Sequence, residues 1–361
     1  MGSDPILQFQ QPRGDVPLAP LTTLGIGGPA RWMTRAASMD DVAAAHEWAE
    51  ERSLPLLVLG GGSNLVVADE GFDGLVLQVA VCGVRTTQRA DDVTLSVGAG
   101  ESWDAIVVLA VERGLAGVEC LSGIPGTVGG TPIQNVGAYG QEVASVIESV
   151  TAFDRDERRC VVLSAAECEF AYRMSRFKGR DAGRFVVCEV TFRLRAGPPT
   201  TTYPDVVARL SQQGVRTAAV RDVREAVLSV RRAKGMVIDA ADPDTRSVGS
   251  FFMNPVIDRA AFIRIDGNPP HYMMDNDTVK IPAAWLIERS GFGRGHADGA
   301  VGLSTKHPLA IINRGGATAR DVVRFARRIK GAVLDRFGIV LRPEPIFVGF
   351  NHDADVEYLR G

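Results

Sequence analysis

Two glycine-rich segments constrain what this chain can fold into more than any other part of its sequence. The first covers residues 60–64 and follows the apolar run 56–59, and the second extends from residue 124 to 140. Glycine adopts positive φ at little cost, so successive backbone amides can point into one concavity and bind phosphate oxygens. Both segments therefore predict loops at which the backbone meets an anionic, nucleotide-like ligand.

The first segment lacks the residues that accompany the commonest phosphate-binding turns. No Gly-Lys-Ser or Gly-Lys-Thr follows it, and no Gly-x-Gly-x-x-Gly pattern opens a helix. Apolar runs at 65–68 and 75–79 instead predict two short strands around a turn. Taken alone, the segment is equally consistent with a plain hairpin turn.

The second segment points more strongly to a ligand. Its glycines alternate with small or polar residues, a composition that supports neither helix nor strand. Long ordered loops are usually functional, so we interpret the segment as a wall against which a flat or charged ligand lies. The glycines are Gly126, Gly129, Gly130, Gly137 and Gly140.

Composition narrows the classes of protein that fit. The chain has 361 residues, 45% of them hydrophobic, which is enough for two or three packed domains. Its 40 basic and 43 acidic residues give a net charge of −3, so no nucleic-acid partner is predicted. The five cysteines show no Cys-x-x-Cys spacing, which favours reduced thiols, no metal site and a cytoplasmic location. No apolar run reaches the roughly 18 residues of a membrane span.

Helix and strand signals are mixed along the chain. Capping boxes at 38–41 and 318–321 predict helix starts, the second opening the strongest amphipathic pattern, which ends at Gly338. The glycine- and proline-containing segment 196–202 predicts a linker. We expect helices at 38–54, 102–114, 221–234, 283–290 and 318–337, strands at 56–59, 93–97 and 339–341 and within 149–195, and a solvated tail at 351–361.

Three polar side chains have surroundings that suit chemistry, although each also has a plainer reading. Arg173 lies in a run of aromatic and cationic residues that suits an anionic substrate, or a surface ion pair. Ser250 follows a glycine and precedes two phenylalanines, which also describes a turn serine. Glu344 lies between two prolines, where a surface glutamate is the ordinary reading. Gly-x-Ser-x-Gly is absent, which argues against a hydrolase.

Taken in order, the motifs resemble those of the UDP-N-acetylenolpyruvoylglucosamine reductase family, from about residue 21 to 347. Each motif alone is weak, but the whole series is specific. The motifs are Leu21-Thr22-Thr23-Leu24-Gly25-Ile26-Gly27-Gly28-Pro29-Ala30, Leu59-Gly60-Gly61-Gly62-Ser63-Asn64, Gly123-Ile124-Pro125-Gly126-Thr127-Val128-Gly129-Gly130, Pro132-Ile133-Gln134-Asn135-Val136-Gly137-Ala138-Tyr139-Gly140, Tyr172-Arg173, Gly249-Ser250-Phe251-Phe252-x-Asn254-Pro255 and Pro343-Glu344.

The resemblance implies an α+β protein with a vanillyl-alcohol-oxidase or PCMH-type FAD-binding fold of two α+β subdomains, plus a separate α+β substrate-binding domain. The implied FAD-binding subdomains are 1–82 and 83–220, with the C-terminal strand 339–361 returning to them, and the substrate-binding domain is 221–338. The implied cofactors are FAD and NADPH. The implied reaction reduces the enolpyruvyl ether of a UDP-sugar to UDP-N-acetylmuramate in cytoplasmic peptidoglycan precursor synthesis, with no obligate protein partner.

The resemblance also assigns residues. It implies that Arg173 and Glu344 hold the substrate carboxylate and that Ser250 donates a proton. FAD would be bound by Gly60, Gly61, Gly62, Ser63, Asn64 and Leu65 at its pyrophosphate and by Pro125, Gly126, Thr127 and Gly130 at its ring. Gln134, Tyr139, Tyr203, Lys234 and Asn254 would lie around the substrate or the nicotinamide nucleotide, and Tyr203 indicates the subclass in which a tyrosine-bearing loop closes over the substrate.

Two other functions remain open at this point. Another FAD-dependent oxidase of the same fold would share the FAD-binding segments but would carry a different substrate region. A non-catalytic nucleotide-binding module would keep the glycines and need neither Arg173 nor Glu344.

Overall fold

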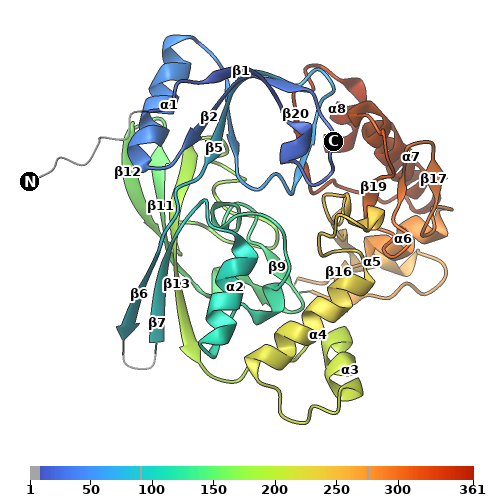
Figure 1. Ribbon diagram of the computed structural model, residues 1–361. Coiled ribbons are helices and arrows are strands. Elements are labelled where there is room, and N and C mark those ends of the chain that lie inside the picture. Colours follow the sequence, from blue (N-terminus) through green and yellow to red (C-terminus); the bar gives the residue numbers. More distant parts are fainter. Residues whose placement is uncertain (1–8, 90–91, 275) are drawn as a thin grey trace, which may run out of the picture. The chain divides into compact units, whose positions relative to one another are not determined.

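The computed structural model describes residues 9–89, 92–274 and 276–361, which divide into two compact units (Figure 1). The first unit is built from the segments up to residue 16, 30–61 and 73–233. The second is built from 17–29, 62–72 and 234–361. Both units mix helices with small sheets, as an α+β chain should.

The first unit contains two sheets with their hydrophobic core. One has the strand order β1-β2-β5-β3, with β3 parallel to β5, and the other has the order β12-β11-β13-β7-β6, with β8 pairing with β13. The strands are β1 Arg13–Pro17, β2 Pro29–Ala36, β3 Leu56–Leu59, β5 Phe72–Val79, β6 Val84–Arg89, β7 Asp92–Gly98, β8 Leu115–Ala116, β11 Ile147–Asp154, β12 Arg159–Ser164 and β13 Phe185–Ala196. A small hairpin joins β9 Gly137–Ala138 to β10 Gln141–Glu142.

The helices of this unit are α1 Met39–Glu51, α2 Trp103–Glu112, α3 Pro204–Gln212 and α4 Val220–Ala233. The capping box predicted at Ser38 is confirmed: its side chain accepts from the Asp41 amide, and the Asp41 carboxylate accepts from the Ser38 amide. Helix α3 was not predicted, and its buried residues Val206 and Leu210 pack in one cluster with α4. A short helix with two apolar contacts gives little sequence signal, because tertiary packing stabilises it.

The second unit contains the long helix α7 Ala319–Phe337, with Thr318 as its capping-box residue and Gly338 ending it at φ 66°. Its predicted apolar stripe is buried at Val322, Phe325 and Ile329. The other helices are α5 Arg259–Ile263, α6 Ala283–Arg289 and α8 Ala354–Arg360. The strands are β4 Leu65–Val67, β14 Val256–Asp258, β15 Tyr272–Met273, β16 Thr278–Lys280, β17 Ala297–Asp298, β18 Val301–Leu303, β19 Ile311–Asn313 and β20 Ile346–Val348, paired as β14-β16-β15, β17-β18-β19 and β20-β4.

Two expectations for the C-terminal segment were wrong. The strand predicted at 339–341 is absent, and β20 begins only after Pro345 and runs parallel to β4. The expected solvated tail contains helix α8, whose Val356 and Leu359 are buried. The buried Lys330 ammonium of α7 donates to the Leu359 carbonyl at 3.0 Å, so α8 is tied to α7 by a polar contact that local sequence does not reveal.

Two further differences concern connections. Strands β4 and β5 exist as expected but do not pair with each other, because β4 pairs with β20 and β5 with β2 and β3. Helix α4, expected to open the substrate region, belongs to the first compact unit, and the second unit resumes at Lys234. The functional domain limits remain a prediction. In the described part of the chain, no helix is both long and apolar enough to cross a membrane.

We expect Thr318→Ala to lower the free energy of unfolding by about 1 kcal/mol, because the hydroxyl accepts from the Asp321 amide at 3.1 Å. Thr318→Ser keeps the acceptor and should restore most of the loss. Chemical denaturation of both variants measures their free energies of unfolding. An equal decrease in Thr318→Ala and Thr318→Ser would show that the hydroxyl cap contributes nothing.

Candidate functional site

The two glycine-rich segments touch each other through bare backbone. A Cβ at Gly61 would lie 2.6 Å from the Gly126 Cα, and one at Gly60 would lie 2.8 Å from the Thr127 Oγ1. Real Cβ atoms do not approach the backbone so closely, so this contact requires glycine. The structure therefore brings together two segments that the sequence implicated separately.

The backbone around this contact has unused hydrogen-bond donors. Among the residues that the structure describes, none accepts a hydrogen bond from the amides of Gly61, Gly62, Ser63, Gly126 or Thr127. Gly62 and Gly126 have positive φ, 61° and 119°, whereas the other two glycines of the first loop are needed for close approach and not for their φ. Clustered free amides are what an anion such as a phosphate binds.

Backbone hydrogen bonds join the second glycine-rich segment to the start of helix α2 and to the residue that follows strand β7. The Trp103 amide donates to the Gly126 carbonyl at 3.1 Å, and the Gly129 amide donates to the Ala99 carbonyl at 2.9 Å. The segment itself is mainly turns with the short 3-10 helix Val128–Gly130, as its composition predicted. A Cβ at Gly130 would meet open space, so this glycine faces away from packed neighbours.

Arg173 reaches the same segment from a tight turn. It has φ 55°, in a turn closed by mutual backbone hydrogen bonds between Ala171 and Met174. Its Nη2 donates to the Gly137 carbonyl at 2.8 Å. The fully buried Asn135 supports this arrangement, because its Nδ2 donates to the Ala171 carbonyl at 3.1 Å. Asn135 belongs to the glycine-rich segment, and its polarity within a loop is the only local sequence signal for this supporting role.

Tyr139 and Tyr203, two of the predicted substrate residues, pack edge to face. Their ring centroids are 5.2 Å apart at an interplanar angle of 87°. Tyr139 has φ 50°, an uncommon conformation for a large side chain, and Tyr203 is the N-cap residue of α3. Gln134 is half-buried in the same glycine-rich segment.

In the second unit, Ser250 and Glu344 lie on adjoining segments. The Glu344 amide donates to the carbonyl of Phe251 at 2.8 Å, and the Met253 amide donates to the Arg342 carbonyl at 3.0 Å. Phe251 is buried, which fixes the position of the preceding serine. Ser250 itself is half-buried and follows Gly249, whose φ is 76°.

Three other predicted residues of this unit have distinct surroundings. Asn64 binds the segment that carries Glu344, since its Nδ2 donates to the Glu344 carbonyl at 3.3 Å. Asn254 binds the start of helix α6, because its Oδ1 accepts a hydrogen bond from the first amide of that helix, that of Ala283, at 2.9 Å. Lys234 directly follows α4 and is half-buried, and Leu65 opens β4. Pro125 lies one residue before the Gly126 contact.

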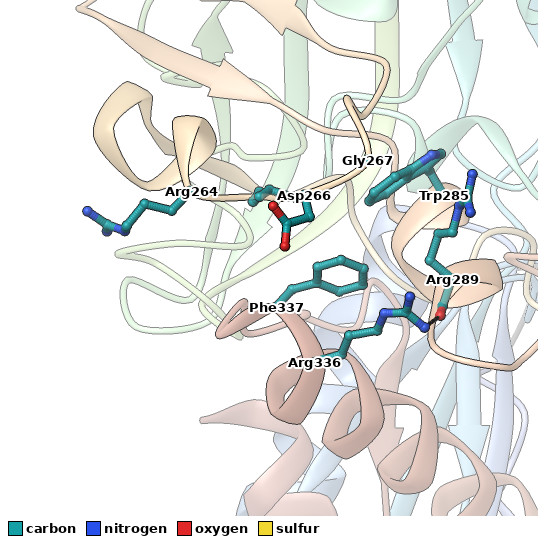
Figure 2. A pocket seen from close by; sticks show the side chains of 8 residues that line it. Arg264, Asp266, Gly267, Trp285, Arg289, Arg336 and Phe337 are labelled. Carbon is teal, nitrogen blue, oxygen red and sulfur yellow. Dashed lines mark hydrogen bonds between the residues drawn. The ribbon is translucent and has the colours of Figure 1, made fainter.

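A cavity of about 260 Å³ occurs in the second unit but contains none of the predicted residues. Figure 2 shows Phe337 between Asp266 and Arg336, with Trp285 beside Gly267. The rings of Trp285 and Phe337 lie 5.5 Å apart. The candidate site therefore rests on the backbone and side-chain contacts above and not on this cavity.

Asp104 of α2 anchors the start of the second glycine segment. Its Oδ1 accepts from the Gly123 amide at 2.6 Å, and Arg224 of α4 binds the carboxylate with two hydrogen bonds of 2.7 and 2.9 Å. Burial opposes ionisation, but the hydrogen bonds from Arg224 and the Gly123 amide, with the charges of Arg224 and Arg231, outweigh it and lower the pKa of Asp104. No local sequence pattern indicates this role of Asp104, because its partners Gly123 and Arg224 are distant in the chain.

Known proteins resemble the whole chain. A model of the UDP-N-acetylenolpyruvoylglucosamine reductase C-terminal domain matches residues 242–348, and an FAD binding domain model matches residues 31–162, which include both glycine-rich segments. A UDP-N-acetylenolpyruvoylglucosamine reductase of Thermobifida fusca is 50% identical, covering 93% of this chain and 97% of the relative. One from Streptomyces coelicolor is 45% identical, covering 93% and 90%. The crystal structure of the Thermus caldophilus reductase has a TM-score of 0.65 at 26% identity, covering 93% of this chain and 99% of that one.

We expect Gly61→Ala to weaken FAD binding about tenfold or more, because the new methyl group forces the two glycine-rich segments apart. Titration of the stripped protein with FAD, followed by flavin fluorescence, measures this. Gly293→Ala is the matched control, since nothing lies within 4 Å of a Cβ there. Equal FAD affinity in both variants would contradict the role of the contact.

We expect Asp104→Asn to destabilise the protein by about 1 kcal/mol at pH 7, a modest value because the carboxylate is 36% exposed. The folded-state pKa of Asp104 lies below its ordinary value of 3.8, so its contribution is present above about pH 4 and is lost as the pH falls through the folded-state pKa. Urea unfolding at several pH values measures the difference from the parent protein. A difference that grew on acidification would contradict the assignment, and Asp73→Asn, at an exposed ion pair, is the control.

Proposed function

This chain belongs to the UDP-N-acetylenolpyruvoylglucosamine reductase family, and on that premise we propose how its own residues perform the reaction. It is an FAD-dependent oxidoreductase that reduces the enolpyruvyl UDP-sugar with NADPH in peptidoglycan synthesis. The expected family and the expected FAD-binding fold are both confirmed. Neither an oxidase nor a non-catalytic module is favoured by these relatives.

The observation that carries the proposal is the contact between Gly61 and Gly126 inside the region matched by the FAD binding domain. The free amides of residues 61–63 suit the pyrophosphate of FAD, and they lie where bare backbone allows close approach. The free amides of Gly126 and Thr127 suit the polar edge of its ring, with Pro125 and Gly130 beside them. When bound, FAD supplies hydride transfer from NADPH to the vinyl CH2 carbon of the substrate.

Arg173 and Glu344 are proposed to stabilise the charge that this transfer creates. Hydride addition to the CH2 carbon places negative charge on the adjacent carbon, from which it spreads into the substrate carboxylate. A guanidinium binds a carboxylate through charge-assisted hydrogen bonds. The hydrogen bond from Arg173 to the Gly137 carbonyl orients the guanidinium within the glycine-rich segment. We assign the other carboxylate oxygen to Glu344, which would bind it either as the protonated acid or by bridging through Arg173.

Ser250 is proposed to deliver the proton that completes the product. The carbon next to the carboxylate must be protonated, and a hydroxyl is a weak acid in water. Two buried phenylalanines follow Ser250 and fix its backbone, and the adjoining segment carries Glu344. A positioned hydroxyl can act as a general acid when bound substrate excludes water and a neighbouring charge lowers its pKa.

Substrate binding is assigned to Gln134, Tyr139, Tyr203, Lys234 and Asn254. The edge-to-face pair of Tyr139 and Tyr203 supports the proposal that this chain belongs to the subclass with a tyrosine-bearing substrate loop. We propose a cytoplasmic location, because all five cysteines are free thiols, as suits a reducing compartment.

The function is tested with purified protein under anaerobic conditions. NADPH should bleach the bound flavin, and the enolpyruvyl UDP-sugar should then restore its colour with formation of the lactyl ether. Failure of the sugar to reoxidise the reduced protein would refute the reductase, and anaerobic bleaching of the oxidised flavin by a small alcohol would favour an oxidase.

We expect Ser250→Ala to leave flavin reduction by NADPH near the parent rate while product formation falls about a hundredfold or more, because only the protonation step loses its donor. Stopped-flow absorbance of the two half-reactions measures this. Ser211→Ala, on the exposed side of α3, should change neither. If both half-reactions slowed together, Ser250 would be structural.

A further inference from the structure

Arg231 is a buried cation that the reaction described above does not use. It lies near the end of α4 with 9% of its surface exposed, whereas its neighbour Arg232 is exposed. On α4 it continues the buried stripe of Val220, Val223 and Val227. Burying a guanidinium costs free energy unless hydrogen-bond acceptors compensate, so the acceptors of Arg231 indicate its role.

Two acceptors of Arg231 come from different parts of the proposed site. Its Nη2 donates to the Gly123 carbonyl at 3.3 Å. Its side chain is also hydrogen-bonded to the Tyr139 phenol. Gly123 leads into Pro125 and Gly126, and Tyr139 lies at the far end of the same glycine-rich segment, so one side chain holds both ends of that segment.

The Gly123 end is fixed on both of its backbone polar groups. Asp104 of α2 accepts from the Gly123 amide at 2.6 Å, while Arg231 of α4 binds the carbonyl. Arg224, two helical turns before Arg231, binds Asp104 in a bidentate pair. The peptide groups beside the Gly126 contact are thus held between two helices by charged side chains.

The Tyr139 end carries backbone strain that needs support. A large side chain at φ 50° is held there only when its surroundings outweigh the cost. The ring is packed against Tyr203 and the hydroxyl is bound by Arg231. Removal of the cation therefore frees the hydroxyl while leaving the ring contact in place.

We propose that Arg231 is a positioning residue that holds the FAD-facing start of the glycine-rich segment and the substrate-facing Tyr139 in one geometry, so that it supports binding of both ligands. This rests on the proposed function for the substrate side, but the FAD side is measured without turnover. Arg231 itself contacts neither reacting group in this assignment and acts through Gly123 and Tyr139.

The test compares variants that separate the two contacts. Asp104→Asn weakens only the Gly123 end, and Tyr139→Phe removes only the hydroxyl, whereas Arg231→Gln affects both. Arg232→Gln is the matched control, because it removes the same charge from the exposed side of the same helix. Each variant is titrated with FAD after removal of the flavin, and KM for the UDP-sugar and kcat are measured on the reloaded enzyme.

We expect Arg231→Gln to weaken FAD binding and to raise KM for the UDP-sugar, each by about tenfold, with kcat much less changed. Tyr139→Phe should raise KM without changing FAD affinity, and Asp104→Asn should do the reverse. The double variant of Arg231→Gln with Tyr139→Phe should have the KM of the worse single variant, because both remove the same hydrogen bond.

Three results would overturn the proposal: Arg231→Gln behaving like Arg232→Gln, KM effects of Arg231→Gln and Tyr139→Phe that multiply in the double variant, or a fall in thermal stability with neither binding constant changed.

If Arg231→Gln does not fold, Arg231→Lys takes its place. It keeps the charge but has a single donor group, so it should lose one of the two contacts, and parent-like values for both ligands would overturn the proposal. An inactive parent protein would instead refute the proposed function, and the FAD titrations would still judge the Gly123 contact.

Discussion

The candidate site depends on a backbone contact at which no side chain fits. Gly61 lies against Gly126 so closely that a single methyl group would force the segments apart. Neighbouring amides have no hydrogen-bond acceptor among the residues that the structure describes. One requirement, close approach of two bare segments, thus explains both why the loops pack together and why they can bind an anion.

Polar contacts to the backbone help to hold the functional side chains in place. Asn135 fixes the turn that presents Arg173, and Asp104 fixes the start of the glycine-rich segment. Each accepts or donates to backbone atoms, so loss of one leaves a buried partner unsatisfied, which costs more than the bond itself contributes.

Local signals in the sequence predicted the elements that local interactions stabilise. The capping boxes at Ser38 and Thr318 set helix starts because each is complete within four residues. Helices α3 and α8 were missed because their stability comes from distant partners. The glycine-rich segments could each be identified by composition, but their mutual contact could not, since nothing in either segment encodes the other. Of the missed residues, Arg231 had the clearest sequence signal, because it occupies a position on the buried stripe of helix α4, where a charge needs a partner.

The pairing of β4 with β20 has a consequence for the order in which the molecule is made. Residues 65–67 run beside residues 346–348, and within the described ranges β4 pairs with no other strand. Because the two strands are far apart in the sequence, β4 can pair only after residues 346–348 have been synthesised, so its apolar residues lack their strand partner during much of translation.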